Sequence, residues 1–172
     1  GKVFLCHAGD SRAYLYRDGR LAQLTHDHSY VQELVDCGTI TAEEAEHHPQ
    51  KNIITRALGV DYRLDPEFTS VPVQKGDMIL LCTDGLTNVL PKEKIEEIFT
   101  KGGFYDIPDR LVDAANAGGG PDNITALLLG VVEGAEDLGD EVDGLPAGDL
   151  AAPLVEVLPE GHALHALHHD IL

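Results

Sequence analysis

The chain has 172 residues, 43% of them hydrophobic and 5% aromatic, and a net charge of -18. That length suits one globular domain, and the composition excludes collagen, coiled coil and wholesale disorder. With 12 basic residues against 30 acidic ones, no nucleic-acid partner is expected, because phosphate backbones are bound by clustered Lys and Arg. The longest apolar runs, Met78–Cys82 and Ile124–Val132, are too short to cross a bilayer, so no membrane contact is expected either.

The first third of the chain predicts strands and then short helices. Apolar runs indicate strands over Val3–His7, Ala13–Tyr16 and Leu21–Thr25. Asp18-Gly19 supplies the positive φ angles of a tight hairpin between the last two. Ser29–Val35 then reads as a helix, and the Thr41-to-Glu44 spacing is a capping box that begins a second one.

The rest of the patterned region alternates strands and helices. Strands are predicted over Phe68–Val73 and Met78–Thr83, joined through Lys75-Gly76-Asp77. Helices are predicted to begin at Pro91 and Pro108, each with an apolar stripe, before the apolar strand Ile124–Val132, which should lie inside its sheet. Strands mostly linked by hairpins and interleaved with helices predict an antiparallel α+β domain.

Composition changes near residue 132. Residues 133–172 hold ten acidic residues and no Lys or Arg, whereas residues 1–132 carry a net charge of -8. A segment so acidic buries too little apolar surface to offset the entropy of ordering. We therefore expect a domain over 1–132 and an acidic, disordered tail over 133–172.

The three cysteines, Cys6, Cys37 and Cys82, are an odd number and lie far apart in the sequence. Two of them fall in apolar strands, where a reduced thiol behaves as a small hydrophobe. This pattern favours a reducing, cytoplasmic compartment. The chain begins with Gly1 and not Met, so we expect it to be the downstream piece of a longer protein.

Three aspartates stand at the ends of predicted strands, each beside small or turn-forming residues: Asp10 in Gly9–Arg12, Asp84 before Gly85, and Asp122 after Pro121. If the strands share one edge, the carboxylates converge and raise one another's pKa unless a cation compensates. Oxygen ligands without paired Cys or His favour Mg²⁺ or Mn²⁺, which activates water and neutralises phosphoryl charge. Taken singly, each motif is more simply an ordinary turn.

Taken together, the motifs resemble the metal-dependent serine/threonine protein phosphatases of type 2C, the PPM family, and most closely its bacterial members. The resemblance runs from Lys2 to about Val132, and the matching segments come in family order. They are Gly9–Arg12, Leu24–Ser29, Ile40–Ala45, His48–Asn52, Thr55–Gly59, Leu81–Leu86 and Gly119–Thr125.

This resemblance implies an α-β-β-α sandwich of antiparallel sheets that hydrolyses phosphoserine and phosphothreonine in proteins by a metal-activated water. It implies two catalytic Mn²⁺ or Mg²⁺ ions and a third, looser one. Asp84 and Asp122 are expected to ligate the first ion, and Asp10 with Asp84 the third, helped by the backbone carbonyl of Asn52. Residues 29–52 resemble the flap, the segment beside the site that influences which phosphoprotein docks.

The sequence also departs from the family pattern. An Arg that grips phosphate and an Asp-Gly that bridges the catalytic metals are expected upstream, and neither precedes Gly9 here. We therefore expect an N-terminally incomplete fold, inactive by itself, with unpaired strand edges and an exposed apolar face where strands that flank Val3–His7 and Ile124–Val132 are missing. Two alternatives remain: a pseudophosphatase that acts as a binding module, and a simple acidic cation-binding module. Expected partners are phosphorylated Ser/Thr proteins and a Ser/Thr kinase, with the protein itself a monomer.

Other polar residues have simpler interpretations. Arg12 and Arg56 could contact phosphate, but Arg12 is better explained by pairing with a carboxylate that fixes its loop. His26 and His28 flank Asp27 and could titrate near neutrality, although a loop position with ordinary hydrogen bonds is favoured over a general acid. Cys82 should point into the core, which argues against a thiol nucleophile.

Overall fold

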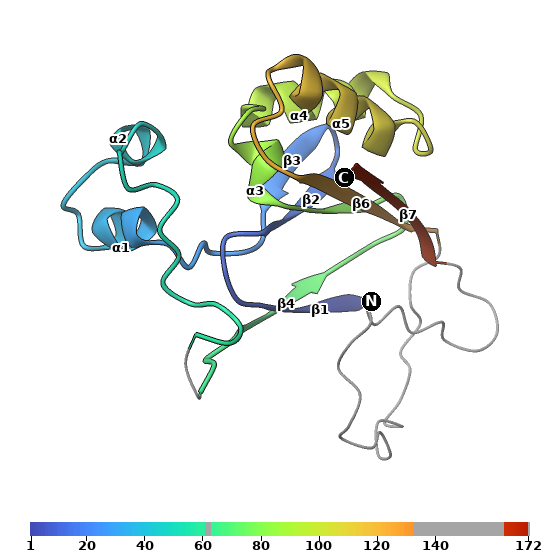
Figure 1. Ribbon diagram of the computed structural model, residues 1–172. Coiled ribbons are helices and arrows are strands. Elements are labelled where there is room, and N and C mark those ends of the chain that lie inside the picture. Colours follow the sequence, from blue (N-terminus) through green and yellow to red (C-terminus); the bar gives the residue numbers. More distant parts are fainter. Residues whose placement is uncertain (61–62, 133–163, 172) are drawn as a thin grey trace.

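Two antiparallel sheets, one above the other, form the framework of the molecule (Figure 1). The computed structural model describes residues 1–60, 63–132 and 164–171. A two-stranded sheet pairs β1 (Lys2–His7) with β4 (Glu67–Pro72). A five-stranded sheet has the order β3-β2-β5-β6-β7. Its strands are β2 (Arg12–Arg17), β3 (Arg20–Gln23), β5 (Met78–Cys82), β6 (Ile124–Val131) and β7 (Leu164–Ile171).

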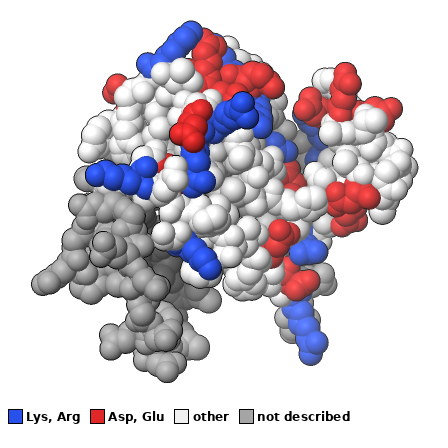
Figure 2. Space-filling view, turned by 180° about the vertical axis from the view of Figure 1, so that it is seen from behind, with Lys and Arg blue, Asp and Glu red and all other residues white. Residues whose placement is uncertain are grey.

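The described helices fall into two groups: α1 (Tyr30–Asp36) and α2 (Ala42–Glu46), and then α3 (Asp84–Thr87), α4 (Lys92–Lys101) and α5 (Ile107–Ala117). The second group covers the face of the five-stranded sheet that points away from β1 and β4, while α1 and α2 form a lobe beside the sheets (Figure 1). Figure 2 shows carboxylates on that lobe. The antiparallel α+β class is confirmed. In the described part of the chain, no helix is long and apolar enough to cross a membrane.

Local signals in the sequence produce the turns and helix ends that they predict. Asp18 and Gly19, between β2 and β3, have φ angles of 52° and 78°, as the hairpin requires. Ser29 caps α1 by accepting from the backbone N–H of Gln32. At α2, Thr41 and Glu44 form the complete capping box. These elements need only near neighbours in sequence, which explains why they are predictable.

The main core lies between α3–α5 and the five-stranded sheet. The apolar stripe of α4 packs there, and so does that of α5, against strand residues that are almost fully buried. The core includes Ile95, Ile98 and Phe99 of α4, Leu111, Val112 and Ala115 of α5, and Leu80, Ala126 and Leu128 of β5 and β6. β6 lies between β5 and β7, inside the sheet as expected.

β4 and β5 follow each other through the predicted connection, but they do not pair with each other. β4 pairs with β1, and β5 pairs with β2 and β6. The Lys75–Asp77 connection therefore carries the chain from the small sheet to the large one. An apolar alternating run identifies a strand but not its partner, which is chosen by contacts distant in sequence.

The predicted boundary near residue 132 coincides with the end of β6. Residues 133–163 and 172 of the predicted tail lie outside the described residues, whereas Leu164–Ile171 forms β7, an edge strand on β6. On the outer face of the small sheet, Phe4 is 80% exposed and Phe68 is 75% exposed. The exposed apolar face predicted at Val3–His7 is thus present among the described residues, whereas β6, the strand of the Ile124–Val132 run, has a paired neighbour on each side.

A buried carboxylate anchors the connection between the two sheets. Asp77 is 2% exposed and accepts hydrogen bonds from Arg17 Nε at 2.8 Å and from the Gln74 backbone N–H at 2.8 Å. Its own carbonyl accepts from the N–H of Val131 at 2.9 Å. The hydrogen bond from Arg17 holds the pKa of Asp77 below its ordinary value, outweighing the burial that acts in the opposite direction.

We expect Asp77→Asn to lower the free energy of unfolding by about 2 kcal/mol at neutral pH, because the charge-assisted bond to Arg17 is lost. A depressed pKa adds stability that is present above 3.8, the ordinary value, and is lost as the pH falls through the lower value of the folded state. The difference between the two proteins should therefore shrink in acid. Urea unfolding at a series of pH values measures it. Asp18→Asn, in the exposed hairpin turn, is the control, and a difference that does not change with pH would contradict the assignment.

Candidate metal centre

The register of three neighbouring strands places the three predicted aspartates at one end of the large sheet. Arg12 of β2 pairs with Cys82 of β5, which in turn pairs with Ala126 of β6. Asp10 comes two residues before Arg12, and Asp84 comes two residues after Cys82. Because these strands are antiparallel, both positions lie at the same sheet edge. Asp122 precedes β6 and reaches that edge too.

Asp84 and Asp122 are held together by close backbone packing. The hydroxyl of Thr83 donates to the Asn123 carbonyl at 3.2 Å and accepts from the Thr125 N–H at 3.0 Å. Gly85 then lies so close to the same loop that a Cβ would be 2.3 Å from the Asn123 carbonyl oxygen. A glycine is therefore required after Asp84 because two chain segments approach each other closely there, and not because the backbone makes a turn with positive φ.

Asp10 is presented by a rigid turn. Gly9 has a φ of +116°, a conformation that side chains rarely adopt. Two residues after Asp10, the Arg12 guanidinium donates to both carboxylate oxygens of Asp27, with Nε at 3.0 and 2.9 Å and Nη2 at 2.6 Å. Gln23 donates to the same carboxylate at 3.1 Å. The predicted pairing of Arg12 with a carboxylate is thus confirmed.

The charges around Arg12 are consistent with a fixed ion pair. Burial disfavours the charged guanidinium, but its hydrogen bonds to Asp27 and the nearby Tyr14 raise the pKa of Arg12 overall. Arg12 therefore stays charged, and its Nε and Nη2 donors are occupied by the Asp27 carboxylate.

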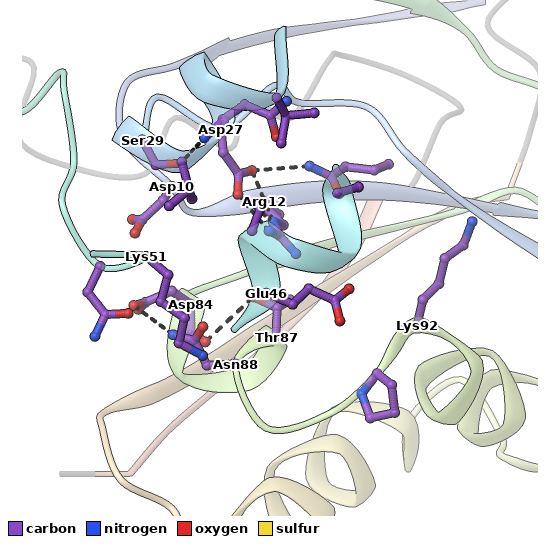
Figure 3. Close-up of a pocket in the computed structure, with 18 of the residues that line it drawn as sticks. Asp10, Arg12, Asp27, Ser29, Glu46, Lys51, Asp84, Thr87, Asn88 and Lys92 are labelled. Carbon is purple, nitrogen blue, oxygen red and sulfur yellow. Dashed lines mark hydrogen bonds and ion pairs between the residues drawn. The ribbon is translucent and has the colours of Figure 1, made fainter. Parts of the chain in front are cut away.

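All four predicted ligand residues line one pocket of about 480 Å³, namely Asp10, Asn52, Asp84 and Asp122. Lys51, Gly85 and Asn88 line it as well. A wider cavity of about 860 Å³ shares Asp10, Asn52 and Asp84 and extends between the lobe of α1 and α2 and the start of α4. Figure 3 shows Asp10 and Asp84 on facing sides of this cavity, near Lys51.

The donor set fits a hard divalent cation. Partial burial raises the pKa of Asp10, and the negative charge of Asp84 raises it further. This repulsion is what a bound cation would relieve. The carboxylates of Asp10, Asp84 and Asp122 offer only oxygen, and His and Cys are missing among the described pocket residues, so the set suits Mg²⁺ or Mn²⁺ better than Zn²⁺.

Sequence reasoning missed two parts of the pocket. The helix α3, which begins at Asp84, has only four residues, too few for apolar periodicity to show. Asn88 donates from its side-chain amide to Asp84 Oδ2 at 3.2 Å and so orients that carboxylate. The i, i+4 spacing of Asp84 and Asn88 was the available signal.

The remaining sequence candidates lie away from the pocket. His26 is exposed and contacts Asp36 through Nε2 at 2.8 Å. Arg56 donates to the Asp65 carbonyl at 3.1 Å and lines neither pocket. Cys82 is 5% exposed, and burial raises the pKa of its thiol to about 12. It therefore remains protonated, and the argument against a thiol nucleophile is confirmed. None of the three cysteines, all in the described part of the chain, forms a disulfide.

Comparison with known proteins agrees with this geometry. The family model described as protein phosphatase 2C matches residues 1–126. The serine/threonine phosphatase stp of Listeria monocytogenes is 46% identical over 129 residues, which are 74% of this chain and 51% of that protein. The crystal structure of the Mycobacterium tuberculosis serine/threonine phosphatase PstP/Ppp has a TM-score of 0.72 and 43% identity, covering 77% of this chain and 55% of that one.

A crystal structure of the PstP catalytic domain in complex with two manganese ions gives a TM-score of 0.69 and 42% identity, over 77% of this chain and 54% of that chain. The fold and the similarity match part of the bacterial serine/threonine phosphatase domains. The chain belongs to the protein phosphatase 2C family, which confirms the resemblance drawn from the motifs. It spans about half the length of the curated Listeria relative and of the solved domains.

We expect Gly85→Ala to weaken both the fold and the metal site, because its Cβ forces the Asp84 loop away from Asn123. Overpacking of this kind costs about 1–3 kcal/mol. Thermal unfolding and Mn²⁺ titration should show a lower melting temperature and a lower affinity. The matched control is Gly103→Ala, whose nearest neighbour is the flexible carboxylate of Asp106 at 3.3 Å. Equal behaviour of the two variants would contradict the close-approach argument.

Proposed function

We propose that the protein hydrolyses phosphoserine and phosphothreonine esters in proteins with the help of Mn²⁺ or Mg²⁺. The observation that carries this proposal is the shared pocket of Asp10, Asp84 and Asp122. The names of the relatives, which are serine/threonine phosphatases, support it, as do the two manganese ions of the PstP complex.

In this proposal, Asp84 and Asp122 hold a catalytic ion, and Asp10 with Asp84 holds a looser one beside the Asn52 carbonyl. The Thr83 and Gly85 contacts support the first assignment because they keep the two loops together. The elevated pKa of Asp10 next to Asp84 supports the second. Bound ions of this kind acidify water and neutralise charge on a phosphoryl group. The protein's own contribution is to aim the carboxylates and to keep Arg12 engaged with Asp27.

The flap, residues 29–52, supports the proposal from the substrate side. Its helices α1 and α2 form one wall of the wider cavity, and the start of α4 forms the opposite wall. Lys51 and Lys92 lie at this cavity and offer positive charge to a phosphoprotein segment (Figure 3). The flap would thus influence which phosphoprotein docks. A Ser/Thr kinase acting on the same proteins would be the antagonist.

The proposal also covers the domain organisation of the chain and its location in the cell. We propose that residues 1–132 act as part of the phosphatase domain and 133–172 as an acidic extension, with the protein acting as a monomer in the cytoplasm. The end of β6 near residue 132 supports the boundary. The unpaired state of Cys6, Cys37 and Cys82 supports a reducing compartment.

A binding module without turnover is the second candidate. The observation in its favour is that Arg12, the arginine that lines the wider cavity, is held by Asp27 and so is not available to grip phosphate. In this case the pocket would bind Mn²⁺ and a phosphorylated segment without breaking the ester bond.

The test measures phosphate release from a phosphothreonine peptide, with and without Mn²⁺, by the longest protein that the gene encodes. We expect release that depends on Mn²⁺ and falls by about 100-fold in Asp84→Asn, because a carboxylate ligand is lost. Asp109→Asn, on the first turn of α5, is the charge-matched control. Binding of Mn²⁺ and peptide without release supports the binding module, and an unchanged rate in Asp84→Asn contradicts the metal assignment.

A further inference from the structure

His28 is a buried residue with no role in the pocket described above. Its side chain is 4% exposed. Its ring stacks on that of His7 in β1, with centroids 4.6 Å apart and planes at 9°. Its Nε2 lies 3.3 Å from Glu67 Oε2 in β4. His28 is therefore fixed against the small sheet, although it belongs to the loop that follows β3.

Two hydrogen bonds join His28 to Gly9. The Gly9 backbone N–H donates to His28 Nδ1 at 3.2 Å, and the His28 backbone N–H donates to the Gly9 carbonyl at 2.9 Å. Gly9 is the residue with a φ of +116° immediately before Asp10. His28 thus holds both polar groups of the glycine that sets the direction of Asp10.

The backbone of His28 also holds the segment that follows Asn52. Its carbonyl accepts from the Thr55 N–H at 2.8 Å. Next to it, Ser29 forms a β-bridge with Ile54. The candidate ligands Asp10 and Asn52 come from distant parts of the chain, and His28 is bonded near both.

The hydrogen-bond pattern determines the tautomer of His28. Because Nδ1 accepts a backbone N–H, the proton of the neutral ring is on Nε2 and is donated to Glu67. The Arg56 guanidinium lies 3.2 Å from the same nitrogen and opposes a positive ring. Burial lowers the pKa of His28 first, and the charges of Arg56 and His7 add to the effect, outweighing Glu67. The ring is therefore neutral at neutral pH.

This pattern also excludes the obvious alternative, a metal ion shared by His7, His28 and Glu67, whose ligand atoms lie within 4.8 Å of one another. The lone pair on Nδ1 of His28 is used by Gly9, and Nε2 carries a proton. The two stacked rings also direct their lone pairs into parallel planes, which do not meet at one ion. The arrangement serves the Gly9 turn instead.

We propose that His28 is a positioning residue for metal binding: its ring anchors Gly9 to the small sheet and so directs Asp10 into the pocket with Asp84. The inference rests on the proposed function, because it concerns the same carboxylates. It adds that the looser ion depends on a residue that touches neither ion nor substrate.

Two substitutions separate the contacts of the ring. In His28→Asn the side-chain oxygen takes the place of Nδ1, so Gly9 keeps its acceptor. In His28→Gln the amide reaches toward Glu67 and Gly9 loses its acceptor. We expect Mn²⁺ titration of the whole chain to show an affinity about 10-fold weaker in His28→Gln and only about threefold weaker in His28→Asn, which keeps the acceptor for Gly9 but loses the contact with Glu67. Hydrogen exchange of the Gly9 amide should be faster only in His28→Gln.

The control is Thr25→Val, which removes another buried acceptor, the hydroxyl that takes the Ala13 N–H at 3.1 Å. It should lower the melting temperature without changing Mn²⁺ affinity. Asp10→Asn shows what loss of the ligand itself does. If the parent binds no Mn²⁺, the proposed function fails. If Asp10→Asn weakens binding but His28→Gln does not, or if His28→Asn weakens it as much as His28→Gln, the positioning role alone fails.

If His28→Gln does not fold, Glu67→Leu carries the test. This variant leaves the ring in place but removes the partner of Nε2, at a side chain that is 35% exposed and so tolerant of substitution. We expect Mn²⁺ affinity to fall by about threefold. An unchanged affinity would overturn the proposal, because the ring would then not need its anchor on the small sheet.

Discussion

The antiparallel register of β2, β5 and β6 is the constraint on which the candidate metal centre depends. The pairing of Arg12 with Cys82, and of Cys82 with Ala126, brings residues from three distant stretches to one sheet edge. A slip of one residue would turn every side chain of a strand to the opposite face. It would therefore expose the buried residues of β5 and β6 and would at the same time separate the carboxylates. The core and the site are thus stabilised by the same pairing.

Carboxylates gathered in this way repel one another, and the surrounding structure resists their separation. Asp84 is held to the Asn123 loop by the Thr83 hydroxyl and by a glycine that leaves room for the carbonyl. On the other side, the partly buried pair of Arg12 and Asp27 stiffens the loop after Asp10. The pKa of Asp10 is raised by its partial burial and by the negative charge of Asp84, and a bound divalent cation would relieve this repulsion. These supports and the repulsion between Asp10 and Asp84 are the features expected of a preorganised cation site.

The proposed flap, residues 29–52, reaches the pocket at its C-terminal end. Lys51 and Asn52 line the pocket, and the segment that follows them pairs with the backbone of His28 and Ser29. The wall that would meet a substrate is therefore built on the same loop that holds Gly9. A change in the flap could reach Asp10 through these backbone bonds, without any contact between the flap helices and the carboxylates.

The sequence by itself determined the features that depend on neighbouring residues: the Asp18-Gly19 hairpin, the Thr41 capping box, the apolar stripes of α4 and α5, and the motifs that identify the family. It also singled out Asp10, Asp84 and Asp122, since acids beside glycine at strand ends are visible locally. Only the tertiary structure decided that β4 pairs with β1 and not with β5, that Asn88 supports Asp84, and that His28 supports Gly9. The physical reason is that strand partners and buried hydrogen bonds are selected by burial and register between distant segments, which local patterns do not encode.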